Sequence, residues 1–162
     1  MGTVNYKTSS RVCTVGYDTD TSGYDIEELM QEYQCTRENA EERAAELEEF
    51  DIEETYQNCK YYISELPKME HYSVAIEHGY YEGFCILVTL DCDILGHYDK
   101  RLINKELTQI KALLKKCIEE QGLRVCTPSW CTDWKHTLKE SLDALDEAVK
   151  KERENIKKLK DV

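Results

Sequence analysis

The sequence has no long apolar run and none of the short motifs that mark the commonest enzyme families. No stretch approaches the roughly 20 apolar residues that span a bilayer, and the first ten residues, MGTVNYKTSS, lack the apolar core of a secretion signal. We therefore expect a soluble, cytoplasmic protein without membrane contact. The patterns GxxxxGK, GxGxxG, GxSxG and HExxH are also absent. We predict no enzymatic activity and no cofactor.

The chain also lacks an internal repeat and a low-complexity linker. Its 162 residues, 41% of them hydrophobic, are enough for one domain with a proper core and too few to expect two. We predict a single domain over residues 1–162.

No two of the eight cysteines are spaced as Cys-x-x-Cys. Without a secretion signal, reduced and partly buried thiols are expected. Cys126, Cys131 and His136 follow one another at intervals of five residues, and the fold could bring His97 or Cys117 to them as further zinc ligands. Because structural zinc sites usually show tighter ligand pairs, we predict no metal.

The most apolar and least charged stretch is 71–90, HYSVAIEHGYYEGFCILVTL. Its alternation of apolar residues predicts two adjacent antiparallel strands. Tyr80 and Tyr81 lie between them, where they either form a recognition surface or fold back onto the core. Asp91, Asp93 and His97 follow, and we favour a solvated loop there over a metal or acid–base site. The four predicted strands lie near 11–17, 71–78, 84–91 and 123–127.

Helices are predicted over 24–34, 37–50, 51–66, 100–121 and 134–159, each from apolar residues at intervals of three or four. Thr36 is the expected cap of the second helix, and Asp51 with Glu54 resembles a capping box that starts the third. Gly122 is expected to end the fourth, and Thr132 or Asp133 to cap the last. The fold class is therefore α+β: a three- or four-stranded, mainly antiparallel sheet packed with amphipathic helices.

Acidic residues are concentrated in one part of the chain. Residues 18–54 contain 15 Asp and Glu but only Arg37 and Arg43 as basic residues, a net charge of −13. The whole chain carries −12, so the remainder sums to about +1. Since the apolar residues here have helical spacing, we predict an acidic helical arm within residues 18–66.

Three segments carry a resemblance to a known group of proteins: GYYEGF at 79–84, PSWCT at 128–132 and the lysine-rich stretch HTLKESLDALDEAVKKERE from His136. With the opening MGTVNYKTS, they resemble small proteins of bacteriophages and related mobile elements. The resemblance spans most of the chain and implies a viral or mobile-element origin. It attaches no function and no residue roles.

The first functional hypothesis is that the arm mimics a nucleic-acid backbone. Carboxylates at every third or fourth residue of a helix lie about 5–6 Å apart, similar to phosphates along a strand. A phage protein of this kind would inhibit a nucleic-acid-binding defence protein of its bacterial host, as an anti-CRISPR or anti-restriction protein, without touching nucleic acid itself. The oligomeric state is left open. The candidate contact residues are Glu27, Glu28, Glu32, Glu38, Glu41, Glu42, Glu46, Glu48, Glu49, Tyr80 and Tyr81.

Three alternatives stay open. The acidic faces can be ordinary solvated surface. The protein can instead be a sponge for a nucleotide defence signal, with Tyr80 and Tyr81 stacked on a base and Arg101, Lys105 or Arg124 on phosphate. The third alternative is a metal- or thiol-dependent enzyme built on the cysteine and histidine set described above.

Overall fold

The computed structural model describes residues 7–17, 24–78, 83–93, 98–126, 135 and 137–159. These residues form four helices and four strands, which confirms the predicted α+β class. In chain order the elements are β1 (Lys7–Tyr17), α1 (Ile26–Tyr33), α2 (Arg37–Ser64), β2 (Tyr72–His78), β3 (Phe84–Asp93), α3 (Lys100–Gln121), β4 (Arg124–Cys126) and α4 (Leu138–Lys157).

The four strands form one antiparallel sheet in the order β2-β3-β1-β4. The predicted hairpin is confirmed, with Val74 opposite Val88 and Ile76 opposite Ile86. The first strand begins at Lys7, four residues before its predicted start, and its pairing with β3 shifts register between Arg11 and Thr14. The long first strand therefore holds the short β4 at one edge, while β2 forms the other.

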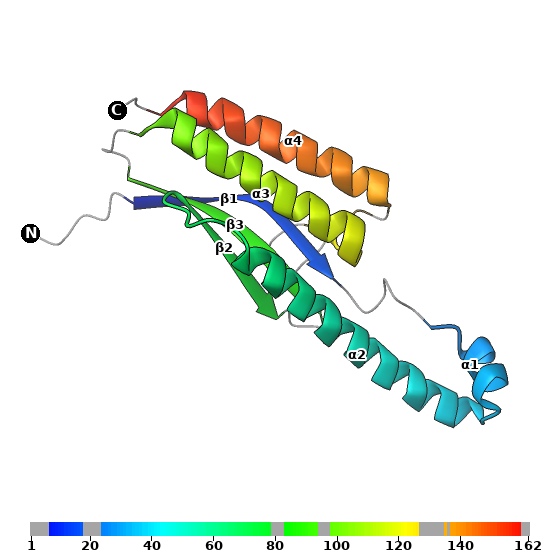
Figure 1. The fold of residues 1–162 in the computed structure, drawn as a ribbon. Coiled ribbons are helices and arrows are strands. Elements are labelled where there is room, and N and C mark those ends of the chain that lie inside the picture. Colours follow the sequence, from blue (N-terminus) through cyan, green and yellow to red (C-terminus); the bar gives the residue numbers. More distant parts are fainter. Residues whose placement is uncertain are drawn as a thin grey trace, which may run out of the picture.

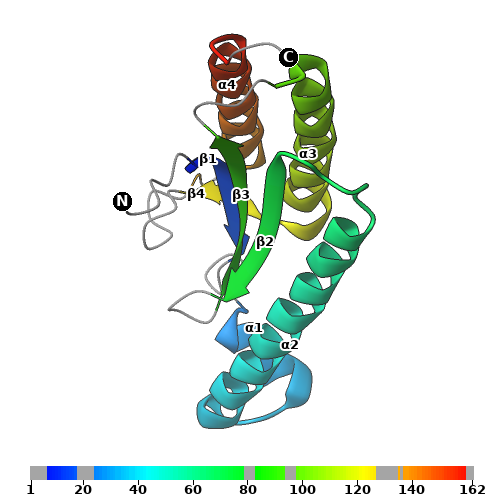
Figure 2. The same ribbon diagram turned by 90° about the vertical axis from the view of Figure 1, so that its left-hand side faces the viewer.

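The core lies between the sheet and a layer of helices. Helices α3 and α4 lie side by side on the sheet, and the second half of α2 packs next to α3 (Figures 1 and 2). Alternate residues of β3, namely Phe84, Ile86 and Val88, are at most 2% exposed. The predicted apolar stripe of α3 is fully buried against them, and it consists of Ile103, Leu107, Ile110, Leu114 and Cys117.

One predicted break in the chain is wrong. Helix α2 is continuous over 28 residues, and Asp51 lies inside it rather than at the start of a new helix. The sequence suggests two helices because α2 has two apolar stripes. Ala40 and Ala44 face one way, whereas Tyr56 and Cys59 face another, about 110° further around the axis. A single straight helix therefore buries one face in its first half and a different face in its second.

The helix starts show which side chains cap them. The Thr36 hydroxyl accepts a hydrogen bond from the Asn39 backbone N–H at 3.3 Å, as predicted. Helix α4 begins later than predicted, at Leu138, and its cap is Thr137, whose hydroxyl accepts from the Glu140 N–H at 3.0 Å. The predicted caps Thr132 and Asp133 are therefore wrong for this helix, and both lie outside the described residues.

Gly122 ends α3 in the left-handed conformation, with φ of 74°. Replacing it with alanine should lower the free energy of unfolding by about 1–2 kcal/mol, because a Cβ disfavours this conformation. A Cβ built here meets no atom within 4 Å, so the cost comes from the backbone alone. Gly122→Asn should cost less, since Asn tolerates positive φ. Urea unfolding of both variants tests this, and equal losses would contradict it.

Candidate partner interface

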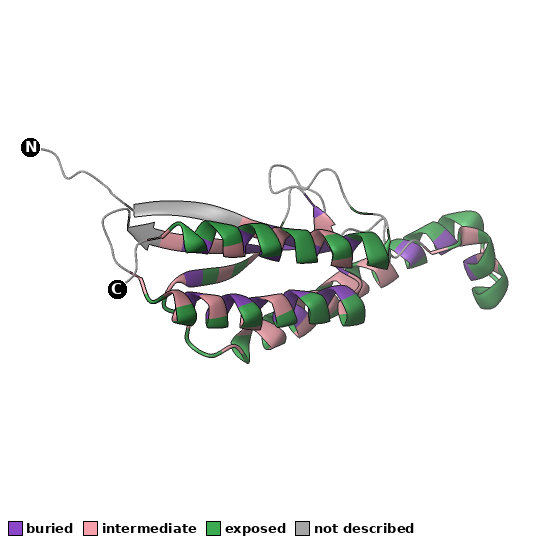
Figure 3. Ribbon diagram, turned by 90° about the horizontal axis from the view of Figure 1, so that it is seen from above, coloured by how far each residue is buried: buried purple, intermediate pink, exposed green. Residues whose placement is uncertain are grey.

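A helical hairpin projects from the body of the molecule. It consists of α1 and the first half of α2, and it extends beyond the sheet and the other helices (Figures 1 and 3). Its small core is separate from the main core: Leu29, Ala40 and Ala44 are buried together. Side chains including Ile26 and Leu47 pack partly around them. We call this hairpin, residues 24–54, the arm.

Polar contacts within the arm link α1, and Tyr24 before it, to α2. The Tyr24 hydroxyl donates to the Asp51 carboxylate, and this hydrogen bond raises the pKa of Tyr24 to about 12. Arg37 forms an ion pair with Glu27. Arg43 lies over the Tyr33 ring, 5.0 Å from its centroid, and approaches Glu46 at 3.6 Å. Both arginines of the arm are thus engaged within it, which partly neutralises two of its glutamates.

The arm displays most of the predicted glutamates to solvent. Of the nine, Glu48 is half-buried and the other eight are exposed. The structure brings four of them into one row along α2, on the side opposite Ala40 and Ala44, and adds an exposed residue that the sequence hypothesis did not include. This row, which we call the acidic ridge, consists of Glu38, Glu42, Glu46, Glu49 and Glu53.

The ridge has a linear charge density comparable to that of a nucleic-acid strand. From Glu38 to Glu53 the helix rises by about 22 Å, over which five carboxylates are exposed. A DNA strand carries one phosphate per about 3.4 Å of axis, so the same length holds about six or seven. The ridge therefore has roughly three-quarters of the charge density of one strand.

No family model, curated protein or solved structure matches this chain. The resemblance to bacteriophage proteins stays a prediction, and the geometry of the described residues carries the functional argument. Among those residues, no helix is both long enough and apolar enough to cross a bilayer.

Other predicted contact residues are placed differently. Glu27, Glu28 and Glu32 lie on α1, and Glu41 lies on α2 beside the ridge rather than in it. Tyr80 and Tyr81 lie outside the described residues.

Phe50 is one of the apolar residues at helical spacing from which the helix over 37–50 is predicted, but it is 64% exposed. It points about 100° away from the Ala40 and Ala44 stripe, so neither buried face of α2 includes it.

The structure does not gather the residues of the nucleotide-sponge hypothesis. Arg101 and Lys105 lie in the first turns of α3, while Arg124 follows the end of that 22-residue helix, about 30 Å away. One Arg124 guanidinium nitrogen donates to the Leu123 carbonyl at 3.0 Å. These three cations do not converge on one phosphate.

The described residues give little support to a metal or thiol site. His97, Cys131 and His136 lie outside them, and no group of three His, Cys, Asp or Glu within them is arranged to hold a metal ion. Burial raises the pKa of the Cys13 thiol to about 11. A hydrogen bond with Cys117 and burial raise the pKa of Cys59 as well. Both thiols are therefore protonated at neutral pH and poor nucleophiles.

Two buried glutamates join the helices to the start of β2. Glu106 is 3% exposed and its carboxylate lies 2.6 Å from His71 Nδ1. Glu152 is 4% exposed and accepts a hydrogen bond from the Tyr72 hydroxyl at 2.9 Å. We did not single out either glutamate from the sequence. Their spacing could have identified them as buried, because each glutamate falls within the apolar stripe of its helix.

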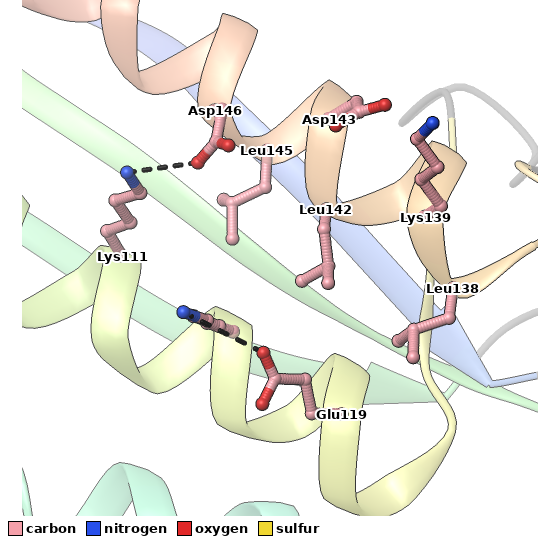
Figure 4. A pocket seen from close by; sticks show the side chains of 9 residues that line it. Lys111, Glu119, Leu138, Lys139, Leu142, Asp143, Leu145 and Asp146 are labelled. Carbon is pink, nitrogen blue, oxygen red and sulfur yellow. Dashed lines mark ion pairs between the residues drawn. The ribbon is translucent and has the colours of Figure 1, made fainter.

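A groove of about 420 Å³ lies between α3 and α4 (Figure 4). Three leucines, three lysines and three carboxylates line it. Lys111 pairs with Asp146 at 3.0 Å and Lys115 with Glu119 at 3.8 Å. Because the charges balance and largely pair with one another, the groove favours neither an anionic nor a cationic ligand. The arm is the stronger candidate.

Proposed function

We propose that the protein is an acidic inhibitor encoded by a bacteriophage or related mobile element, and that it acts in the cytoplasm of an infected bacterium. Its target is a nucleic-acid-binding defence protein, of the CRISPR or restriction type. The arm occupies the target's basic groove in place of a nucleic-acid backbone. The observation that carries the proposal is the acidic ridge, five exposed carboxylates in one row along α2. The ridge lies on the part of α2 that projects from the body (Figure 3).

The charge distribution supports fast, oriented association. The arm, residues 24–54, has 13 Asp and Glu and two Arg, a net charge of −11, and the rest of the chain sums to about −1. The negative field is therefore centred on the projecting end. Such a field steers a basic partner toward the arm and accelerates encounter. Added salt should weaken the association, because it screens exposed charges.

The continuity of α2 supports the proposal in a second way. The same helix that carries the ridge is anchored in the main core through Tyr56, Cys59 and Ile63. Its first half is braced by α1 and by the contacts of Tyr24 and Arg43. The carboxylates are thus held in a row before binding, which reduces the entropy lost when a partner docks.

The test uses purified CRISPR and restriction nucleases in a DNA-cleavage assay. For any nuclease that the protein inhibits, reversal of four ridge residues (Glu38→Lys, Glu42→Lys, Glu49→Lys and Glu53→Lys) should raise the inhibitory concentration at least about tenfold, since removing favourable charges and adding unfavourable ones acts on the whole interface. Excess duplex DNA should relieve the inhibition, because both ligands need the same groove.

A matched variant separates position from net charge. Glu119→Lys, Asp143→Lys, Glu147→Lys and Glu154→Lys make the same charge change at exposed positions of α3 and α4, and this variant should still inhibit. Equal loss of inhibition in both variants would show that inhibition depends on the net charge of the protein and not on the position of the ridge. Inhibition that survives ridge reversal, or that excess DNA does not relieve, would reject nucleic-acid mimicry.

A further inference from the structure

Helix α2 carries two large aromatic side chains on its outer face. Phe50 is 64% exposed and Tyr61 is 62% exposed. They are separated by 11 residues, about three helical turns, so they lie on one line about 16 Å apart along the axis. Glu54 and Gln57 lie between them on the same line and are also exposed. We call these four residues the outer stripe.

The outer stripe belongs to no packing face within the described residues. It points about 160° away from the face through which Tyr56, Cys59 and Ile63 join the main core. It also lies about 90° around the helix from the acidic ridge. Figure 2 shows α2 at the margin of the molecule, beside the edge strand β2.

The spacing of the stripe suits a helical partner. Its residues follow one another at i, i+4, i+7 and i+11, the spacing by which one helix packs along another. Aromatic side chains are enriched among the residues that dominate binding energy at protein interfaces. Two of them on one otherwise charged helix face therefore indicate two anchor points for a helix laid along α2.

The charge around the stripe disfavours a symmetric dimer in which two outer stripes pair. Residues 46–65 contain seven Asp and Glu and one basic residue, Lys60, a net charge of −6. Pairing two such helices would bring twelve net negative charges together across one interface. Glu46, Glu53, Glu54 and Glu65 are all exposed beside or within the stripe, so the complementary surface has lysine or arginine along its flanks.

We propose that the outer stripe docks a basic amphipathic helix of the partner protein. Apolar residues of that helix cover Phe50 and Tyr61, and its flanking cations face the glutamates beside them. The inference rests on the proposed function in taking the partner to be a basic protein, and it adds a contact that salt does not screen. The ridge sets the rate of encounter, and the stripe sets how long the complex lasts.

A pair of synthetic peptides tests the stripe on the full-length protein. The first is a helix of about 18 residues, long enough to fold readily on the surface, with leucines at i, i+4, i+7 and i+11 and lysines at the flanks. The second has the same composition, but its leucines are spread around the helix. Fluorescence anisotropy should show the first peptide binding at least about tenfold more tightly. The difference in affinity between the two peptides should persist from about 0.15 M to about 1 M salt. Over this range the Debye length falls from about 8 Å to about 3 Å, so interactions between exposed charges are screened.

The double variant Phe50→Gln, Tyr61→Gln should abolish the difference between the two peptides. The matched control Leu138→Gln, which changes a 43% exposed residue on α4, should preserve it. Equal affinity of the two peptides for the native protein would overturn the proposal, as would a difference that the double variant retains. A stable dimer in sedimentation that the double variant loses would also overturn it. If reversal of the ridge residues leaves nuclease inhibition unchanged, only nucleic-acid mimicry is rejected, because the peptides measure binding to the outer stripe directly.

Discussion

Replacing Glu106 with alanine is expected to lower the free energy of unfolding by about 3–5 kcal/mol. One carboxylate oxygen of Glu106 accepts from the backbone N–H groups of Glu70 and His71 at 2.6 and 3.1 Å. The other lies 2.6 Å from His71 Nδ1. Alanine would leave three polar groups without their partner in a site where Glu106 is only 3% exposed. Each such group costs about 1–3 kcal/mol when it stays unpaired.

Two further variants distinguish loss of the hydrogen bonds from loss of a charge. Glu106→Gln keeps an oxygen for the two backbone N–H groups and should cost only about 1 kcal/mol. Glu147→Ala, at an exposed position of α4, should change stability by less than about 0.5 kcal/mol. Guanidinium unfolding followed by circular dichroism gives all three values. A cost below about 1 kcal/mol for Glu106→Ala would mean that water replaces the carboxylate.

Glu106 also shows why the fold was easier to predict than its polar contacts. The apolar residues around it, Ile103, Leu107 and Ile110, recur at helical spacing and predict the buried face of α3 correctly. The same spacing places Glu106 within that face. It does not identify His71 as the partner, which lies 35 residues earlier in the chain and meets Glu106 only when β2 packs beneath α3. The period of the apolar residues shows which face of a helix is buried. The partner of a buried polar side chain on that face depends on the tertiary structure.

The acidic arm, too, was predictable from the sequence only in part. Composition and the helical spacing of the apolar residues together predict an acidic helical arm, because residues 18–54 contain 15 carboxylates and only two basic residues. The ridge was not predictable in full. Glu53 joins Glu49 in one row only if the helix continues through Asp51, and the change of apolar stripe at that point suggests a break. In the structure, Asp51 is instead used inside the helix, as the acceptor for Tyr24.

Replacing Phe84 with alanine is expected to cost about 3–5 kcal/mol of unfolding free energy, as is usual for a buried aromatic residue. Phe84 is 2% exposed at the start of β3. Its ring stacks on Tyr17 with centroids 5.9 Å apart and meets the Tyr56 ring edge-on at 5.5 Å. Tyr56 in turn stacks on His78 at 4.6 Å. These four rings join the sheet to α2 close to the point where that helix leaves the body.

The position of this aromatic cluster makes the effect of Phe84→Ala specific. Losing the ring should loosen α2 around Tyr56 first, so amide hydrogen exchange there should accelerate more than exchange in the middle of α3. Tyr61→Ala removes an aromatic ring from the same helix at a 62% exposed position and should change stability by less than about 0.5 kcal/mol. If exchange instead accelerated equally in α2 and α3, Phe84 would stabilise the core as a whole and not the base of the arm in particular. The predicted order follows from the contacts. Helix α3 keeps Leu107, Ile110 and Leu114 in the main core, whereas the part of α2 that precedes Tyr56 contributes only Ile52 to it.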